Sequence, residues 1–173
     1  VIGGDTAGDG SDNFVGSVLD NISGEQVAEL SHKTDEDLYA RQMYCLGMYY
    51  NQALIGIEVN FSTYPEKELE RLEYPKLYQR QTEDSITHKL QYKKGFKTTS
   101  ITRPVIIAGL VEVFRDEIDK INSIELLREA LSFIKNEQGR AEAEQGKHDD
   151  RAMSIAIAYY IRPQQAMKIE KEE

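Results

Sequence analysis

Short apolar runs alternate with amphipathic stretches along the chain, and their spacing predicts a mixed sheet flanked by helices. Val1–Gly4 and Phe14–Leu19 are typical of strands, and a tight turn at Asn21–Gly24 connects the second to an antiparallel partner at Gln26–Ser31. The continuous apolar run Ala53–Val59 indicates a strand that is buried on both faces. Strands first, then strands alternating with helices, indicate an α/β fold around a mixed central sheet.

Helical spacing of apolar residues follows these strands. Thr34, Ser62 and Thr102 are the expected N-caps of three of the helices. The predicted helices run from these caps to about Asn51, Leu72 and Lys120, and two more cover Ser123–Leu131 and Arg151–Ile161. The last of them is apolar almost all round and is therefore expected to be buried. An additional β-hairpin is predicted from Leu77–Arg80 and Ile86–Tyr92, and a further strand from Ser132–Asn136.

The chain reads as one domain. Its 173 residues are enough for one sizeable core, and neither an internal repeat nor a Pro/Gly/Ser-rich linker divides it. We expect a folded domain over residues 1–162 and a polar C-terminal tail over residues 163–173. The longest apolar runs are too short to span a bilayer, so no membrane association is expected. A single cysteine, Cys45, excludes an internal disulfide.

Charge is unevenly distributed along the sequence. The formal net charge of −9 would disfavour a nucleic-acid partner if it were uniform. However, the stretch Ser85–Val111, here called the acid-free segment, contains neither Asp nor Glu. It carries five basic residues, which are Lys89, Lys93, Lys94, Lys97 and Arg103. Such a segment is either a solvated basic hairpin or a strip that contacts phosphates, and its threonines and serine could also bind phosphate oxygens.

Four carboxylates stand out because they border or interrupt apolar elements. Asp5 follows the first strand, Glu58 lies within the buried run, and Asp149 and Asp150 precede the most hydrophobic helix. Each has a structural alternative: Asp5 could orient the following glycine-rich turn, Glu58 could pair with a buried arginine, and Asp149 or Asp150 could cap the helix. Together they are typical of an oxygen-ligand cage for Mg²⁺ or Mn²⁺, in which two ions would catalyse phosphodiester hydrolysis.

Three motifs resemble a known family. They are GGDTAGDGSD at residues 3–12, IEVN at residues 57–60 and GKHDD at residues 146–150. In this order and at this separation, they resemble the C-terminal nuclease domain of tailed-bacteriophage terminase large subunits. The resemblance implies an RNase H-like fold with Asp5, Glu58, Asp149 and Asp150 as catalytic metal ligands. Which of Asp149 and Asp150 is the direct ligand stays open, as does the role of His148, and Asp12 is a candidate auxiliary acid that could simply hold its turn.

The same resemblance implies an endonuclease that cuts concatemeric double-stranded viral DNA during packaging, with little sequence specificity. It implies as partners DNA, an N-terminal ATPase domain, the portal and the small terminase subunit. The expected location is the host bacterial cytoplasm, at the procapsid. The chain has no G-x-x-x-x-G-K-[ST] loop, so we expect an excised domain that cuts DNA and does not pump it. The competing hypotheses are a non-catalytic module that docks on DNA or the portal, and a junction-resolving nuclease of the same fold.

Overall fold

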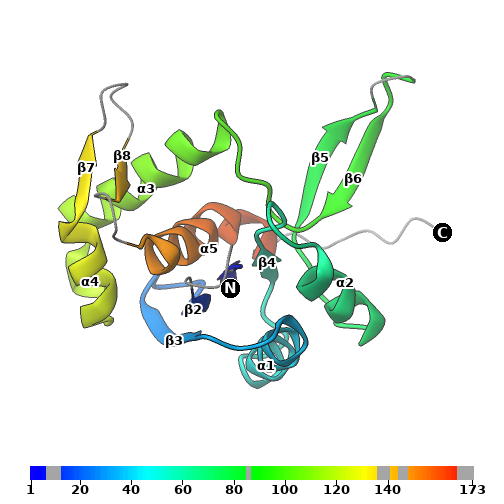
Figure 1. The fold of residues 1–173 in the computed structure, drawn as a ribbon, viewed down its shortest axis with the longest axis horizontal. Helices are drawn as coiled ribbons and strands as arrows, with labels where there is room; N and C mark the ends of the chain where they lie inside the picture. Colours follow the sequence, from blue (N-terminus) through cyan, green and yellow to red (C-terminus); the bar gives the residue numbers. More distant parts are fainter. Residues whose placement is uncertain (7–12, 85–86, 136–140, 144–147, 167–173) are drawn as a thin grey trace.

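A four-stranded mixed sheet forms the centre of the molecule (Figure 1). The computed structural model describes residues 1–6, 13–84, 87–135, 141–143 and 148–166. The strand order is β3–β2–β1–β4, in which β1 pairs antiparallel with β2 and parallel with β4, and β2 pairs antiparallel with β3. The four strands are β1 (Ile2–Asp5), β2 (Phe14–Leu19), β3 (Gln26–His32) and β4 (Ile55–Ile57). The mixed central sheet expected from the sequence is therefore confirmed.

Helices cover both faces of this sheet. The helices are α1 (Glu36–Tyr49), α2 (Tyr64–Arg71), α3 (Thr102–Asp116), the short 3-10 helix η1 (Ile118–Lys120), α4 (Ile124–Leu131) and α5 (Asp150–Ala166). One core cluster joins α5 to α3 and α4, and the other joins α1 and α2 to the strands. Since neighbouring residues of β1 face opposite ways, Gly3 lies against α5 and Gly4 lies against α1.

Strand β1 and helix α5 approach each other unusually closely at Gly3. A Cβ atom there would lie 2.1 Å from the carbonyl oxygen of Ser154 and 2.5 Å from the backbone nitrogen of Ala158. The Ser154 hydroxyl donates a hydrogen bond of 2.9 Å to the Gly3 carbonyl oxygen. Because no larger residue fits, Gly3 brings the first strand into direct backbone contact with the last helix.

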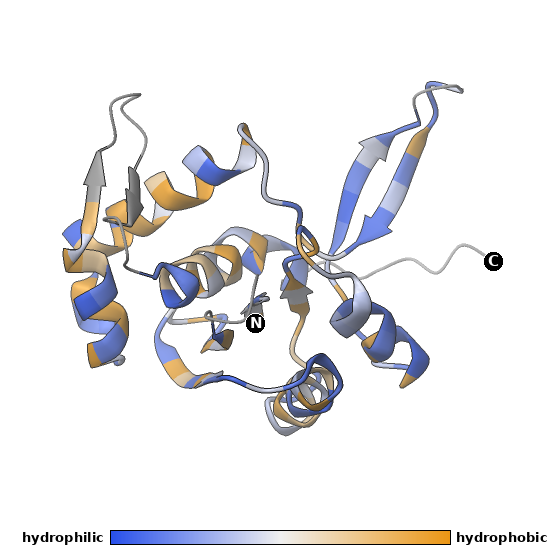
Figure 2. Ribbon diagram, in the orientation of Figure 1, coloured by the Kyte–Doolittle hydropathy of each residue, from blue (hydrophilic) through white to orange (hydrophobic). Residues whose placement is uncertain are grey.

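Two hairpins extend from the body. Strands β5 (Gln79–Glu83) and β6 (Leu90–Lys94) form the predicted additional hairpin, which is mostly hydrophilic (Figure 2). Strands β7 (Phe133–Lys135) and β8 (Ala141–Ala143) form a second hairpin, of which only the first strand was expected from the sequence. The two hairpins project from opposite sides of the molecule (Figure 1).

Several element boundaries differ from those expected. The N-caps are Asp35, Thr63 and Ile101, each next to the residue predicted. The third case has a clear cause, because the Thr99 hydroxyl accepts a hydrogen bond from the Thr102 backbone N–H, which leaves Thr102 as the first helical residue. Helices α1 and α3 also end sooner than expected, at Tyr49 and Asp116.

Helix α5 is longer than expected, because it continues past Ile161 and Pro163 to Ala166. Tertiary hydrogen bonds hold this last turn. The Gln164 side chain accepts from the Gln79 backbone N–H and donates to the Gln79 carbonyl oxygen, and the Gln165 side chain accepts from the backbone N–H of Leu54. The C-terminal end of α5 is thereby attached to the base of the β5–β6 hairpin.

Some sequence predictions lie outside the described residues. They concern the glycine-rich turn at residues 8–12 with Asp12, Ile86 of the predicted hairpin, Asn136, residues 146–147 and the end of the tail at residues 167–173. Among the described residues, we find no helix with the length and apolar character that crossing a membrane requires.

Candidate active site

Asp5 and Glu58 lie side by side because the strands that carry them are parallel neighbours. Asp5 is the last residue of β1, and Glu58 follows the last residue of β4. The Glu58 backbone N–H continues the pairing by donating a hydrogen bond of 2.9 Å to the carbonyl oxygen of Gly4. Both residues are buried, with 7% and 5% of their surfaces exposed. Two acids predicted from separate motifs therefore meet at one edge of the sheet.

Asp150 completes this group from a third element. It is the first residue of α5, and it is as buried as Asp5. Its Oδ2 atom accepts a hydrogen bond of 2.9 Å from the backbone N–H of Asn13, which immediately precedes β2. The Asp150 carboxylate is thus held by the residue before β2, while its backbone begins α5.

The acidic residues influence one another electrostatically. Burial, the negative charge of Glu58 and a side-chain hydrogen bond with Glu58 raise the pKa of Asp5 well above its ordinary value, and Asp150 and then Asp149 raise it further. A hydrogen bond between two carboxyl groups requires a proton between them. Asp5 therefore favours its protonated form in the absence of a cation.

Asp149 is held differently from its neighbour. Its Oδ2 atom accepts a hydrogen bond of 2.5 Å from Nη2 of Arg103, on the first turn of α3. The Nη1 atom of the same arginine lies 3.0 Å from the sulfur of Met153. Of the two adjacent acids, Asp150 is buried and acts more strongly on Asp5, whereas Asp149 is partly exposed and paired with a cation.

The donor set suits a divalent cation chemically. Carboxylate oxygens are the ligands that Mg²⁺ and Mn²⁺ prefer, and bringing a cation among buried acids removes the cost of their mutual repulsion. Within the described part of the chain, no three His, Cys, Asp or Glu side chains lie close enough together to form a ready-made metal site. The contacts that hold the carboxylates include the Asp5–Glu58 hydrogen bond, the Arg103–Asp149 ion pair and the hydrogen bond from the Asn13 backbone N–H to Asp150. A cation would have to displace the proton that Asp5 favours, as metal binding to protonated ligands generally does.

His148 lies at the edge of this group and is exposed. It lines a hollow of about 300 Å³ together with Asn13, Ser132 and residues of α4. The geometry places it beside the carboxylates without giving it a defined role.

The basic residues of the acid-free segment lie on different elements. Lys93 and Lys94 lie on β6, with Lys89 just before that strand, and Lys97 follows it. The Lys94 ammonium forms an ion pair of 2.7 Å with Glu70 of α2, so this lysine already has a partner within the fold. Arg103, on α3, pairs with Asp149 of the acidic group. The predicted DNA-contacting residues are therefore divided between the hairpin and the start of α3.

Two features of the site were not predicted from the sequence. One is the ion pair between Arg103 and Asp149, whose partners are 46 residues apart. The other is the side chain of Asn60, which donates to the Thr98 carbonyl oxygen at 2.6 Å and accepts from the Thr98 backbone N–H at 2.9 Å. Asn60 belongs to one of the three sequence motifs. The motif drew attention to this residue but did not indicate its contact with Thr98.

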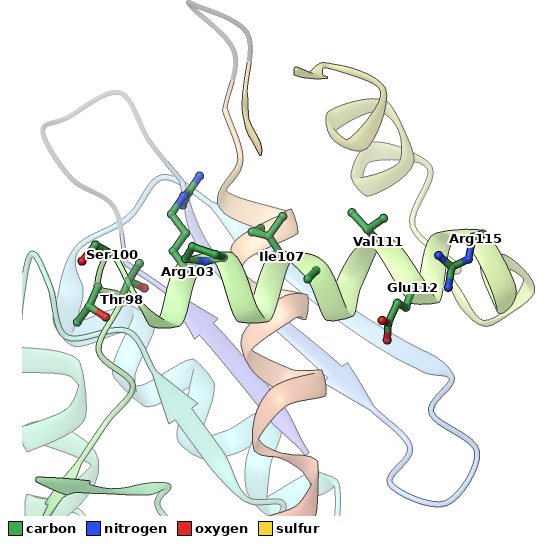
Figure 3. A pocket seen from close by; sticks show the side chains of 10 residues that line it. Thr98, Ser100, Arg103, Ile107, Val111, Glu112 and Arg115 are labelled. Carbon is green, nitrogen blue, oxygen red and sulfur yellow. The ribbon is translucent and has the colours of Figure 1, made fainter. Parts of the chain in front are cut away.

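A larger hollow of about 700 Å³ runs along α3 from the Arg103 end (Figure 3). Thr98, Ser100 and Arg103 lie at one end of it, and Glu112 and Arg115 lie at the other. Ile107 and Val111 line the part between them. Because Arg103 lines this hollow and also binds Asp149, the hollow adjoins the acidic group.

Comparison with known proteins identifies the class of fold. No family model and no curated protein matches the chain. Solved structures do match, and their fold is RNase H-like, as expected from the sequence. They are structures of the large terminase nuclease from thermophilic phage G20c, alone, with bound magnesium and with bound zinc.

The similarity extends over most of both chains. The TM-scores are 0.63, 0.68 and 0.60, at sequence identities of 19%, 20% and 20%. In each case 92% of this chain is covered, together with 80%, 79% and 78% of the respective nuclease chain. The chain therefore has the fold of a large terminase nuclease, which confirms the structural part of the resemblance seen in the sequence.

Proposed function

We propose that this chain is a metal-dependent endonuclease that hydrolyses phosphodiester bonds of double-stranded DNA. The observation that carries the proposal is the convergence of Asp5, Glu58 and Asp150 from β1, β4 and α5. Buried acids that repel one another destabilise a fold, so such a group is typical of a functional site. The shared fold supports the same activity, since the similar solved structures are nucleases and two of them contain magnesium or zinc.

Asp5, Glu58 and Asp150 would hold the cation, and Asp149 would contribute once it leaves Arg103. The expected ions are Mg²⁺ or Mn²⁺, and two of them would fit a hydrolytic site of this kind. When bound, they supply activation of a water molecule and stabilisation of the leaving oxygen. Burial of Asp5 and Glu58 keeps bulk water away from the ligands, and the Asn13 backbone N–H orients the Asp150 carboxylate.

The substrate is proposed to be anionic although the chain carries a net charge of −9. Cations among the acids reverse the local charge, and basic side chains contact phosphates around them. Arg103, Lys97 and the hairpin residues Lys89 and Lys93 are the proposed DNA contacts, with Lys94 contributing when it leaves Glu70. Affinity of the chain alone is expected to be weak and strongly reduced by salt.

We further propose that the cleavage serves viral genome packaging, on concatemeric DNA and with little sequence preference. In that role residues 1–162 act as a nuclease domain alongside an ATPase domain, the portal and the small terminase subunit. The setting would be the procapsid in the host cytoplasm. These partners follow from the resemblance to terminase large subunits, and the fold similarity supports it.

Cleavage of supercoiled plasmid DNA tests the proposal. Wild-type protein should nick and linearise the plasmid in Mg²⁺ or Mn²⁺ and should be inactive in EDTA. Asp5→Ala and Glu58→Ala should each lower the rate by at least about 100-fold, since removal of a group that stabilises transition-state charge costs about that much. The matched control is Asp119→Ala, which removes an exposed acid from η1.

Other outcomes separate the alternatives. Salt-sensitive DNA binding without cleavage in any divalent cation would identify a docking module. Preferential cutting of four-way junctions over linear duplex would identify a junction resolvase. Equal cleavage by folded Asp5→Ala and wild-type protein would show that the site is elsewhere.

A further inference from the structure

The guanidinium of Arg103 is engaged by an acid of its own chain. Nη2 of Arg103 donates to Oδ2 of Asp149 at 2.5 Å, and 31% of the Arg103 side chain and 28% of the Asp149 side chain are exposed. A carboxylate oxygen and a phosphate oxygen both accept charge-assisted hydrogen bonds from a guanidinium. Asp149 therefore occupies a position that a phosphate group could also occupy.

The start of α3 holds Arg103 in a defined place. The Thr99 hydroxyl accepts from the backbone N–H groups of Ile101 and Thr102, and the Thr102 hydroxyl accepts from the Thr99 backbone N–H and donates to the Lys97 carbonyl oxygen. The Asn60 side chain fixes the residue before this turn by its two hydrogen bonds to the Thr98 backbone. The loop after Glu58 and the loop before Arg103 are thus tied together.

The surroundings of Arg103 suit an anion. The hollow along α3 brings Thr98, Thr99 and Ser100 next to the arginine (Figure 3). The Thr98 hydroxyl oxygen is buried and makes no hydrogen bond within the part of the chain that the structure describes. Hydroxyl groups and arginine side chains are common phosphate ligands in protein–DNA contacts. The hollow thus combines a guanidinium with hydroxyl groups at the edge of the acidic group.

Asp149 and Asp150 have different roles in this arrangement. Asp150 is fixed among the buried acids by the Asn13 backbone N–H, whereas Asp149 turns toward α3 and Arg103. Asp149 precedes the helix and Asp150 is its first residue, and the hydrogen bonds of the two carboxylates go to Arg103 and to the Asn13 backbone, respectively. Asp150 belongs with Asp5 and Glu58, and Asp149 belongs with Arg103.

We propose that Arg103 is a phosphate-binding residue for DNA and that Asp149 occupies its guanidinium as an internal substitute for phosphate when DNA is absent. This inference rests on the proposed function, because it assigns a contact to the DNA that the site would cut. DNA phosphate and Asp149 compete for one guanidinium. The competition lowers DNA affinity, and it is relieved when Asp149 turns back toward the acidic group.

A double-mutant cycle on DNA affinity tests this competition. The measurement is fluorescence anisotropy with a labelled linear duplex in EDTA and low salt, so that neither cleavage nor a cation contributes. Asp149→Asn should tighten binding by at least about 10-fold, the effect of one hydrogen bond to a charged group. Arg103→Gln should weaken binding by a similar factor. In the Arg103→Gln background, Asp149→Asn should then have little further effect on affinity, because the guanidinium for which Asp149 and phosphate compete is absent.

Two controls separate competition from a general change in charge. Glu117→Gln removes one acid from an ion pair with Lys120 in η1, so it reports the effect of one lost negative charge. Arg103→Lys keeps a positive charge at the same place and should retain more affinity than Arg103→Gln. Because it is the gentler change, it also provides the test if Arg103→Gln fails to fold.

The inference is overturned if Asp149→Asn tightens binding equally with and without Arg103, or if Arg103→Lys and Arg103→Gln leave affinity unchanged. Plasmid cleavage by wild-type protein in Mn²⁺, measured in parallel, distinguishes this result from failure of the proposed function. Cleavage without coupling between the two residues rejects the inference alone. Absence of both cleavage and DNA binding rejects the function as well.

Discussion

Burying acidic side chains against one another destabilises a folded protein unless a cation or a proton joins them. Asp5 is in this position, because burial and the neighbouring Glu58 raise its pKa well above the ordinary range. The folded state therefore favours the protonated carboxyl more than the unfolded state does. The stability that comes with this proton is fully present at low pH and is lost as the pH rises through the raised pKa.

Asp5→Asn should consequently stabilise the cation-free protein while it abolishes cleavage. In EDTA, its melting temperature should exceed that of wild type by a few degrees at pH 8, since about 1 kcal/mol shifts Tm by about 2–4 °C in a chain of this size. The difference should shrink as the pH falls, because the wild-type carboxyl then takes up its proton. Thermal unfolding followed by circular dichroism measures both.

Mg²⁺ provides the complementary measurement on the same two proteins. It should raise the melting temperature of wild type, because a ligand that binds only the folded state stabilises it, and it should have little effect on Asp5→Asn. A variant less stable than wild type at every pH would contradict the assignment of Asp5 to a strained acidic group.

At the scale of elements, the site depends on the direct contact between β1 and α5. Asp5 ends β1 and Asp150 begins α5, and Gly3 sets the distance between these elements. A wider spacing would move the two acids apart. The packing at Gly3 is therefore part of the site although Gly3 carries no side chain.

Gly3→Ala should destabilise the fold by about 1–3 kcal/mol or more, because its methyl group would overlap the backbone of α5. The matched control is Gly109→Ala on α3, where an added Cβ has no atom within 4 Å and alanine favours the helix by about 1 kcal/mol. Urea unfolding measures the two free energies. Equal stability of the two variants would mean that β1 and α5 do not approach as described.

The sequence predicted the elements whose patterns are local. The apolar residues of Phe14–Leu19, followed by a tight turn, and the apolar run around Ile55 identify strands without reference to the rest of the chain. Glu58 was conspicuous for the same reason, since a carboxylate interrupts an apolar run. These signals were sufficient to bring Asp5, Glu58 and the Asp149–Asp150 pair into one hypothesis.

What the sequence could not predict depends on tertiary contacts. The Arg103–Asp149 pair forms only because α3 packs against α5, and no local pattern indicates it. The extension of α5 past Pro163 is held by hydrogen bonds from Gln164 and Gln165 to distant backbone groups. Strand β8 is only three residues long, and its alanine and glutamate residues have low strand propensity, so the sequence did not indicate its pairing with β7.

Considered as a whole, the molecule places its opposite charges in adjoining regions. The acids gather where β1, β4 and α5 meet, and the basic residues lie on β6 and at the start of α3. Helix α5 connects these regions, since its first turn carries Asp150 and its last turn binds the base of the β5–β6 hairpin. The net charge of −9, which at first argues against DNA, is thus compatible with a DNA-cleaving site that depends on cations.

The most direct test of this account is anomalous scattering from crystals soaked in Mn²⁺. We predict two peaks, separated by about 3.5–4 Å as in two-metal hydrolases, in contact with the carboxylates of Asp5, Glu58 and Asp150. Crystals of Asp5→Asn should lose at least one of them. Manganese bound elsewhere on the wild-type protein, with these carboxylates unoccupied at saturating concentration, would contradict the assignment of a metal-dependent active site.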